Sequence, residues 1–388
     1  MVKDVNPNVF SHTKIMDTFK TGVNFRVMSS DNYEIMTDYT DISGCDAWSM
    51  IATDDVRWKN IFYDFLTSVK TAPIYNTEDH IIVDARQLTY NDKETLYNIV
   101  DIWNGAVHGR GGSVLWLWDR YDRSKNGTIY FNSVITARPD TIATLGKTTL
   151  DLNRLSKEVV ALQEAKGDMA ILYTPNAVPY SDEMLDIIRK TSAALGENGQ
   201  KTRFVVESQL EKFDEYKTII IPNTISLYKE TLDKLKSFVD NGGKLLVIGE
   251  NALTKNEYGD KHDESVVAHI KSKAVCIGFE DAGTTISAAS GAVIKDEITK
   301  FVKADGLDKV TFIDKATGKP LCDADWITAE YDGSYIVNLC SYTWDSREVE
   351  MYIDGEKVTS SEDLINFGKY GESIKLDGHV PLLLKVAK

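Results

Sequence analysis

Long apolar runs are absent from this sequence. Its apolar runs are short, such as Ile219–Ile221 and Leu382–Leu384, whereas a helix that crosses a membrane needs about 20 consecutive apolar residues. The first ten residues, MVKDVNPNVF, contain neither an apolar core nor a small-residue cleavage site, which are the marks of an export signal. We therefore predict a cytoplasmic protein without a membrane span.

Basic residues and paired cysteines are also scarce. Lys and Arg number 44 against 59 Asp and Glu, giving a formal charge of −15. This charge repels phosphate backbones and anionic membrane surfaces, so nucleic acid and membrane are not expected as partners. The four cysteines have no CxxC spacing and suggest buried thiols in a reducing compartment, with a disulfide between the last two as the less favoured alternative. They are Cys45, Cys276, Cys322 and Cys340.

Motifs for cofactors are missing as well. Gly109, Gly111 and Gly112 precede an apolar run without a following Gly-Lys-Ser/Thr, so no phosphate-binding loop is expected. No HExxH motif or Cys/His cluster predicts a metal site. The segment TPNAVPYSDE offers prolines and acids where a flavin phosphate would need amide and hydroxyl donors. The sequence predicts no cofactor, and no cysteine stands at a nucleophile elbow.

Residues 1–165 alternate short apolar runs with helical patterns. The runs VFSHTKIM, GCDAWSM, PIYNTEDHIIV and SVLWLW predict four strands, and residues 58–70 and 93–107 predict helices between them. Such repeats form parallel sheets, and their spacing fits a (β/α) barrel. Four strands would be half of the eight that close such a barrel. Residues 141–163 predict a packed helix that leaves this domain.

The rest of the chain divides into two further predicted domains. In residues 166–305, the apolar runs DMAILYTPNAV, KTRFVVES, YKTIIIPN and KLLVIGEN alternate with helical segments such as 229–240, which predicts a doubly wound, flavodoxin-like α/β sheet. Residues 306–388 contain Asp-Gly turns between alternating residues, a hairpin signal. We predict a small antiparallel β-sandwich there.

Two segments carry the strongest functional pattern. APIYNTEDHII (72–82) predicts a strand that ends near Glu78, and HGRGGSVLWLWDR (108–120) predicts one that carries Trp116 and Trp118. A carboxylate beside aromatic rings suits carbohydrate chemistry. Trp118 is preferred for stacking on a sugar, although both tryptophans also fit a barrel core. Glu78 alone would also fit a solvated loop position.

Other polar residues lie on or just after the predicted strands. Asn76 and His80 could orient Glu78 or bind a sugar hydroxyl, or could only satisfy backbone groups. The carboxyl ends of barrel strands carry active sites, so the remaining polar and aromatic residues there are second-choice substrate contacts, and the last two of them could instead only pair with neighbouring residues at the rim. They are His12, Lys14, Asp46, Trp48, Asp119 and Arg120.

With these residues in view, the sequence resembles bacterial β-galactosidase-type glycoside hydrolases of family 42, in clan A. The resembling segments are HTKIM (12–16), TDISGCDAW (40–48), FYDFLTSVKTAPIYNTEDHII (62–82), WNGAVHGRGGSVLWLWDR (103–120) and ARPDTIATLGKTTLDLNRLSKEVVALQ (137–163). The resemblance implies strands 5 to 8 of a barrel, then a trimerisation domain of class I glutamine amidotransferase-like fold, then a C-terminal β-domain. It also implies that Glu78 is the nucleophile.

The resemblance fails at the second catalytic carboxyl group. The family takes its acid/base glutamate from an Asn-Glu pair on the fourth barrel strand, and no Asn-Glu pair precedes Glu78. We therefore expect the acid/base residue outside this chain. A half barrel would leave open edges, so the chain is expected to be truncated, to pair with another subunit or a separate N-terminal half, or to be an evolved remnant. A fragment or split gene is the favoured interpretation.

Two functions follow from this pattern. The first is a retaining β-galactosidase-type hydrolase in carbohydrate metabolism, which acts on a β-galactoside or related oligosaccharide and requires its missing barrel half. The second is a non-catalytic oligomerisation or carbohydrate-interaction protein, in which the flavodoxin-like domain forms a homotrimer, as the resemblance implies, and the half barrel is vestigial.

Overall fold

The first part of the chain forms a four-stranded parallel sheet. A computed structural model describes residues 5–17, 19, 32–47, 56–81, 92–116, 118, 122–123, 129–130, 135–181 and 183–388. The sheet has the order β1-β2-β3-β4, so strands that follow one another in the chain pair with one another. Its strands are β1 (Lys14–Met16), β2 (Ser43–Asp46), β3 (Ile74–His80) and β4 (Arg110–Trp116). The four predicted βα strands are confirmed as parallel neighbours.

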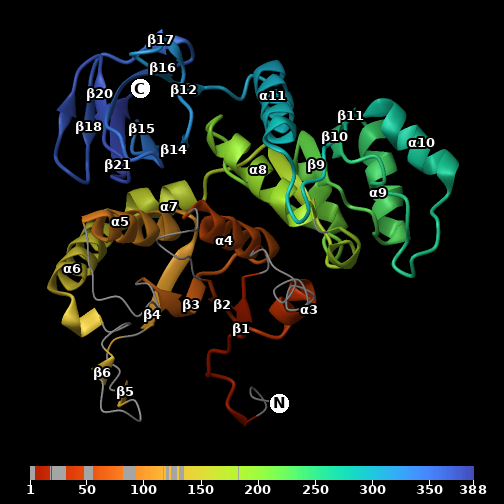
Figure 1. The fold of residues 1–388 in the computed structure, drawn as a ribbon, viewed down its shortest axis with the longest axis horizontal. Helices are drawn as coiled ribbons and strands as arrows, with labels where there is room; N and C mark the ends of the chain where they lie inside the picture. The colour runs from red at the N-terminus through yellow and green to blue at the C-terminus, as the bar shows by residue number, and fades with distance from the viewer. Residues whose placement is uncertain are drawn as a thin grey trace.

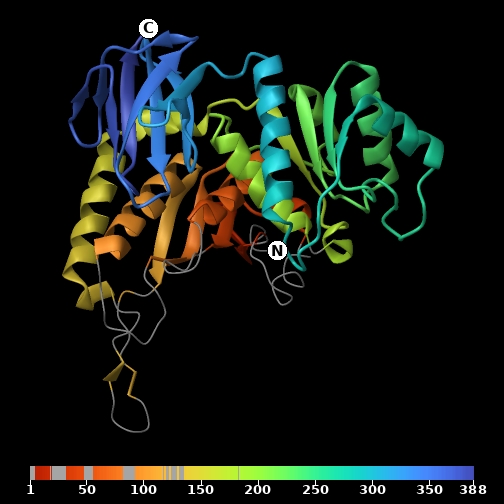
Figure 2. The ribbon, with the colours of Figure 1, turned by 45° about the horizontal axis from the view of Figure 1, so that its top comes forward.

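Helices cover one face of this sheet (Figure 1). They form because apolar residues recur at helical spacing, as in α4, where Ile61, Phe62, Phe65, Leu66 and Val69 are buried. The helices of this part are α3 (Tyr33–Asp38), α4 (Arg57–Val69), α5 (Asp92–Val107), α6 (Pro139–Arg154) and α7 (Ser156–Gln163). Short strands β5 (Asp122–Arg123) and β6 (Ile129–Tyr130) form a hairpin that projects from this part (Figure 2).

A second parallel sheet follows, with the order β11-β10-β9-β7-β8. The first strand in sequence, β7, lies in the interior of the sheet, and the chain adds strands on both sides of it, which is the doubly wound order of flavodoxin-like folds. The strands are β7 (Met169–Tyr173), β8 (Phe204–Val206), β9 (Thr218–Pro222), β10 (Lys244–Ile248) and β11 (Val275–Ile277). The helices are α8 (Met184–Gly196), α9 (Lys229–Asp240), α10 (Glu264–Lys273) and α11 (Ala288–Ala304).

The C-terminal part consists of two antiparallel sheets. One has the order β13-β12-β16-β17 with β20 beside β16, and the other β14-β15-β21-β18-β19. The longer strands are β12 (Val310–Asp314), β14 (Ala324–Tyr331), β15 (Ser334–Ser341), β16 (Arg347–Ile353) and β21 (Leu382–Ala387). The short ones are β13 (Lys319–Pro320), β17 (Glu356–Lys357), β18 (Ser361–Asp363), β19 (Lys369–Tyr370) and β20 (Ile374–Leu376).

Two of the predicted Asp-Gly turns join hairpins in this part. Asp332 and Gly333 connect β14 to β15, and Asp354 and Gly355 connect β16 to β17. All four residues have positive φ, between 48° and 82°, as a type I′ turn requires at both central positions. The antiparallel sheets predicted from these turns are confirmed.

Aromatic side chains join the first sheet's helices to the second sheet. The ring of Phe65 on α4 lies 4.8 Å from that of Tyr173 and 5.4 Å from that of Phe204, and the ring of Phe19 stacks on Phe204 at 5.5 Å. All four rings are buried in one hydrophobic cluster. Helices α4, α5 and α7 thus lie between the first sheet and the rest of the chain (Figure 1).

The structure corrects three expectations. The single helix predicted over 141–163 is two helices, because Leu155 leaves the helical conformation at φ −104° and ψ 21° and packs with Val159 and Leu162. The first predicted strand, over 9–16, is formed only by Lys14–Met16. Cys276 and Cys322 are exposed free thiols rather than buried ones, while Cys45 and Cys340 are buried and free. No helix in the described part of the chain is long and apolar enough to cross a membrane.

A buried lysine caps α7 and predicts a pH effect on stability. The Lys201 ammonium donates to the carbonyls of Leu162 and Gln163 at 3.0 and 2.8 Å, and burial, with Arg203 nearby, lowers its pKa to about 7. Between pH 7 and 9 the unfolded chain then binds more protons at this lysine than the folded chain does, so its contribution to stability rises by about 2 kcal/mol.

Urea denaturation of the wild type and Lys201→Met at both pH values measures this contribution. We expect the unfolding free energy of the wild type minus that of the variant to become more positive as the pH rises. A difference that stays constant would show that Lys201 titrates near its ordinary pKa in the folded chain.

Candidate active site at the carboxyl ends of the first sheet

A bulge in β3 determines which way Glu78 faces. Asn76 pairs with Ser113 and Asp79 pairs with Leu115. Between these two pairs β3 advances by three residues and β4 by two, so β3 contains one extra residue. Asn76 and Asp79 both reach α4, through Tyr63 and Lys59. With strict alternation Glu78 would share the helix-covered face with Asn76. The extra residue instead turns Glu78 and His80 to the opposite face, a re-aiming typical of bulges beside active sites.

The side chains of Lys14 and His80 hold Glu78 in this position. The Lys14 ammonium donates to Glu78 Oε2 and also lies 3.1 Å from Asp46 Oδ2. His80 Nε2 lies 3.3 Å from the other Glu78 oxygen, Oε1. Lys14 comes from β1, Asp46 from the end of β2, and Glu78 and His80 from β3. Three neighbouring strands thus bring these side chains to one point.

Lys14 crosses β2 at a glycine. Lys14 pairs with Gly44 in the β1–β2 register, so the β2 residue beside the lysine has no side chain. A Cβ on Gly44 would lie 2.4 Å from the Thr13 carbonyl oxygen and 2.6 Å from His12 Nδ1. The close approach of β1 and β2 therefore requires glycine at this position.

The surroundings move the pKa values of the two carboxyl groups in opposite directions. Burial tends to raise the pKa of Glu78, but hydrogen bonds from Lys14 and His80 outweigh it, so its pKa is lowered. Burial raises the pKa of Asp46, and the negative charge of Glu78 adds to this against the effect of Lys14. Hydrogen bonding to Glu78 raises the pKa of Lys14. Of the two carboxyl groups, Glu78 is thus the one whose surroundings favour the ionised form.

Aromatic rings border this group. The rings of His80 and Trp116 stack, with centroids 5.7 Å apart. Trp116 Nε1 is buried and has no hydrogen-bond partner among the described residues. Trp118, the tryptophan preferred from the sequence for sugar stacking, is 55% exposed. The ring of His12 packs edge-on against Tyr75 at 5.7 Å. Of the two tryptophans, Trp116 is the one that contacts a direct neighbour of Glu78.

Asn76 lies behind the site and is fully buried. Its amide nitrogen donates to the Ala47 carbonyl at 2.7 Å and to the Tyr63 hydroxyl at 2.9 Å, while its oxygen accepts from the amides of Ala47 and Glu78. These bonds fasten the bulge to β2 and α4. Among the predicted substrate contacts, Asn76 is thus placed as a support for Glu78, and contact with a substrate stays a prediction.

A buried network of charges, which the sequence analysis did not identify, supports the bulge from the helix side. Asp79 Oδ1 and Oδ2 lie 2.8 Å from Lys59 Nζ and 2.5 Å from Arg110 Nη1, and Ser113 donates to Asp79 at 2.7 Å. Lys59 also reaches Asp101 on α5 at 2.6 Å. Burial alone would raise the pKa of Asp79, but the charges of Lys59 and Arg110 outweigh the effect of burial and lower this pKa to about 2. The positive charges of Lys59 and Arg110 thus balance the negative charges of Asp79 and Asp101, and Asp79 directly follows Glu78 in the chain.

The remaining predicted contacts and the metal prediction are placed as follows. Trp48, Asp119 and Arg120 lie outside the described residues. One oxygen or nitrogen each from Asp46, Glu78 and His80 lie within 4.8 Å of one another, which is close enough to hold a cation. The Lys14 ammonium already contacts both carboxylates and supplies that positive charge. The absence of a metal remains a prediction.

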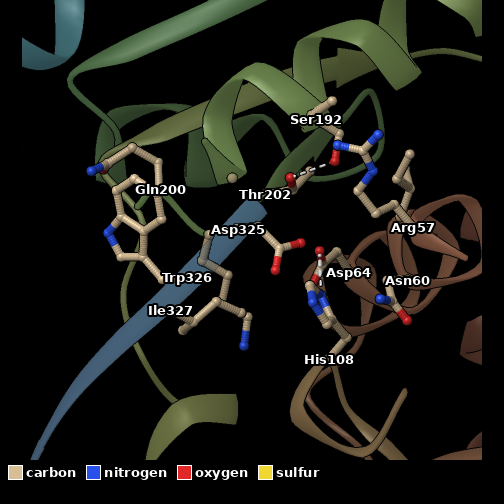
Figure 3. Close-up of a pocket in the computed structure, with 14 residues that line it drawn as sticks. Arg57, Asn60, Asp64, His108, Ser192, Gln200, Thr202, Asp325, Trp326 and Ile327 are labelled. Carbon is tan, nitrogen blue, oxygen red and sulfur yellow. Dashed lines mark hydrogen bonds and ion pairs between the residues drawn. The ribbon is translucent and has the colours of Figure 1, made fainter. Parts of the chain in front are cut away.

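A cavity of about 30 Å³ lies elsewhere, on the far side of α4 (Figure 3). Arg57, Asn60 and Asp64 of α4 line it together with residues of α8 and β14, whereas Lys59 and Tyr63 of the same helix face β3. His108 Nδ1 lies 2.8 Å from Asp64 Oδ2 at its wall. This volume holds about two water molecules and is too small for a sugar.

Comparisons with known proteins bear on the fold. No protein-family model and no curated protein matches the chain. An apo exo-carrageenase of family 42 from Bacteroides ovatus aligns with a TM-score of 0.76 and 20% identity over 100% of this chain and 53% of its own. A family 42 β-galactosidase from G. stearothermophilus, solved as a catalytic mutant, aligns with a TM-score of 0.70 and 12% identity over 100% of this chain and 65% of its own. The β-galactosidase from Rahnella sp. R3 aligns with a TM-score of 0.71 and 12% identity over 99% of this chain and 64% of its own.

These alignments extend over nearly the whole of this chain, which spans between about half and two thirds of the length of those structures. At identities of 20% and below, they establish likeness of fold. The chain has the fold of a large part of a family 42 glycoside hydrolase, and the resemblance predicted from its sequence is confirmed at that level.

Proposed function

We propose that this chain carries the nucleophile of a retaining glycoside hydrolase of β-galactosidase type. The observation that supports it best is the position of Glu78, a carboxyl group with a lowered pKa that a bulge turns onto the open face of a parallel sheet beside Trp116. Retaining glycosidases need such a carboxylate to attack the anomeric carbon. Structures of the same fold are named as β-galactosidases and as an exo-carrageenase, so the proposed substrate is a β-galactoside or related oligosaccharide.

We further propose that residues 1–165 are the second half of a (β/α) barrel, completed by four more strands. Within the described residues β1 and β4 are the edges of the sheet, and parallel sheets are normally buried rather than open. The face that carries Glu78 is only partly covered, since Lys14 and Val114 on it are 43% and 47% exposed. A second half would cover both edges and wall in the substrate, whether it belongs to the same polypeptide or to another.

Covalent labelling tests the nucleophile. The chain, alone and mixed with an N-terminal barrel half, is incubated with 2,4-dinitrophenyl 2-deoxy-2-fluoro-β-galactoside, and the modified peptide is located by mass spectrometry. We expect the label on Glu78 and none in Glu78→Gln, because an amide cannot displace the leaving group. Glu264→Gln, on an exposed face of α10, is the matched control and should label normally. No label in either preparation would contradict the proposed function.

A non-catalytic role is the second candidate, favoured by the open sheet and by the intact α/β part of the chain. In that case residues 166–305 assemble a homotrimer and residues 1–165 are a remnant or a carbohydrate-binding surface. Analytical ultracentrifugation gives the oligomeric state, and calorimetry with β-galactosides detects binding. Binding and trimer formation without labelling of Glu78 would favour this role over catalysis.

A further inference from the structure

Strand β1 carries Lys14 to the candidate site but is held only weakly by its own sheet. It is three residues long and, among the described strands, pairs with β2 alone. An edge strand leaves one row of its backbone groups unpaired. The Tyr33 hydroxyl donates to the Met16 carbonyl at 3.1 Å and adds one contact from α3. The position of the Lys14 ammonium beside Glu78 therefore depends on what anchors the chain beyond Met16.

The chain that follows β1 is anchored on the second sheet. The Asp17 amide donates to the Asp46 carbonyl at 3.3 Å, and Asp17 Oδ1 accepts from the Phe19 amide at 2.8 Å. The Phe19 side chain is fully buried, and its ring lies 5.5 Å from that of Phe204 on β8 and 5.6 Å from that of Tyr173 on β7. These contacts turn the chain from the sheet edge directly into the aromatic cluster between α4 and the second sheet.

Arg189 on α8 completes this anchor. Its guanidinium donates to the Phe19 carbonyl at 3.1 Å and to Asp186 at 3.2 Å, and it lies over the Trp58 ring of α4 at 4.7 Å. Helix α8 packs against α4 (Figure 1). Arg189 is 5% exposed, and hydrogen bonds from a charged donor are strongest where water is excluded. One buried guanidinium thus joins the end of β1 to two helices.

We propose that Arg189 is a positioning residue for the candidate site, an assignment that rests on the proposed function. It fixes the Phe19 carbonyl, and the turn at Asp17 passes this constraint to the end of β1. Strand β1 in turn holds the Lys14 ammonium on Glu78. Residues 166–305 therefore shape the surroundings of the nucleophile, apart from any part that they have in assembly.

Loss of this anchor acts on one contact of Glu78. Among the described residues, the titratable groups around this carboxylate are Lys14, Asp46 and His80. Asp46 and His80 lie on β2 and β3, which are paired on both sides, so only Lys14 comes from the edge strand. Burial raises the pKa of Glu78, and hydrogen bonds from Lys14 and His80 outweigh this effect. A displaced β1 therefore leaves the nucleophile protonated in acid and changes little near pH 8.

The pH dependence of labelling by the dinitrophenyl fluoroglycoside tests this role, in whichever preparation labels the wild type. Arg189→Met, which keeps an apolar stem over Trp58, should label about threefold or more slowly at pH 5 and at the wild-type rate at pH 8. Arg189→Lys keeps the charge and should show a smaller change. The matched control is Arg203→Met, because Arg203 also donates to a carbonyl of the first part, that of Gln163 at 3.4 Å, but not to the turn after β1. It should keep the wild-type profile.

Two further measurements separate this role from a general loss of structure. If Arg189 acts through Lys14, the double variant Arg189→Met/Lys14→Met should have the same profile as Lys14→Met alone. Hydrogen exchange followed by mass spectrometry should show faster exchange of the β1 amides in Arg189→Met, with unchanged exchange in β9 and β10.

Three results would overturn this inference. They are a loss of the same factor at every pH, a shift that adds to that of Lys14→Met, and exchange of the β1 amides at the wild-type rate. In each case labelling of the wild type at Glu78 would still support the proposed hydrolase. A wild type that is not labelled in any preparation would overturn the proposed function and this inference with it.

Discussion

Replacement of Lys59 by methionine is expected to lower the free energy of unfolding by about 3–5 kcal/mol, the usual result of removing one partner of a buried ion pair. The Lys59 side chain is 0% exposed and contacts both Asp79 and Asp101. Without it, Arg110 alone faces two buried carboxylates, at 2.5 and 3.9 Å. One negative charge in the core is then left without compensation, directly behind the bulge that aims Glu78.

The pH dependence gives this prediction a second signature. Burial raises the pKa of Asp101 even with Lys59 present, and loss of the lysine should raise it further above the value in the unfolded chain. In the variant the folded state then binds the extra proton at acidic pH, which removes the uncompensated charge. The deficit relative to wild type should be larger at pH 8 than at pH 5.

Urea denaturation followed by circular dichroism measures both effects. The control is the double variant Lys59→Met/Asp101→Asn, which removes the surplus charge together with its partner and should recover part of the lost stability. A single variant that loses less than about 1 kcal/mol, or a double variant that loses the sum of the two single changes, would show that the network does not act as a balanced unit.

This network illustrates what the sequence could and could not predict. The strands were predictable because apolar runs such as PIYNTEDHIIV have strand length and lie between helical patterns. Lys59 and Asp101, however, lie on helices, where charged residues are ordinarily solvated. Their burial depends on contacts with each other and with Asp79 and Arg110, between residues that are 9 to 42 positions apart in the chain. No local pattern carries that pairing.

The candidate site was predictable in its members but not in its geometry. Glu78, His80, Asp46 and Trp116 follow from polar and aromatic residues at predicted strand ends. Strict alternation from Asn76 would turn Glu78 toward α4, and only the extra residue between Asn76 and Asp79 reverses it. A bulge has no signal in a single sequence, because it is defined by the pairing of two residues on one strand with one residue on the neighbouring strand. For the same reason Lys14 was only a second-choice contact, although it bonds directly to Glu78.

Methionine in place of Lys14 is expected to slow the labelling of Glu78 tenfold or more at pH 5, with little change at pH 8. Lys14 is the only cation that contacts both carboxylates among the described residues of the group, and its hydrogen bond is a main cause of the lowered Glu78 pKa. Without it, two carboxyl groups within 4.8 Å of each other compete for one proton, as in other carboxyl pairs that titrate as a unit. The second ionisation then occurs at higher pH, so the nucleophile is protonated under acidic conditions.

The rate of labelling by the dinitrophenyl fluoroglycoside, measured from pH 4 to 9, tests this directly because its leaving group requires no acid. The acid limb of the profile should move to higher pH by one unit or more in Lys14→Met and by less in Lys14→Arg, which keeps the charge. A uniform loss at every pH would mean that Lys14 only positions Glu78. An unchanged profile would mean that the ammonium does not control the ionisation of Glu78, and that His80, the other group hydrogen-bonded to this carboxylate, keeps it ionised instead.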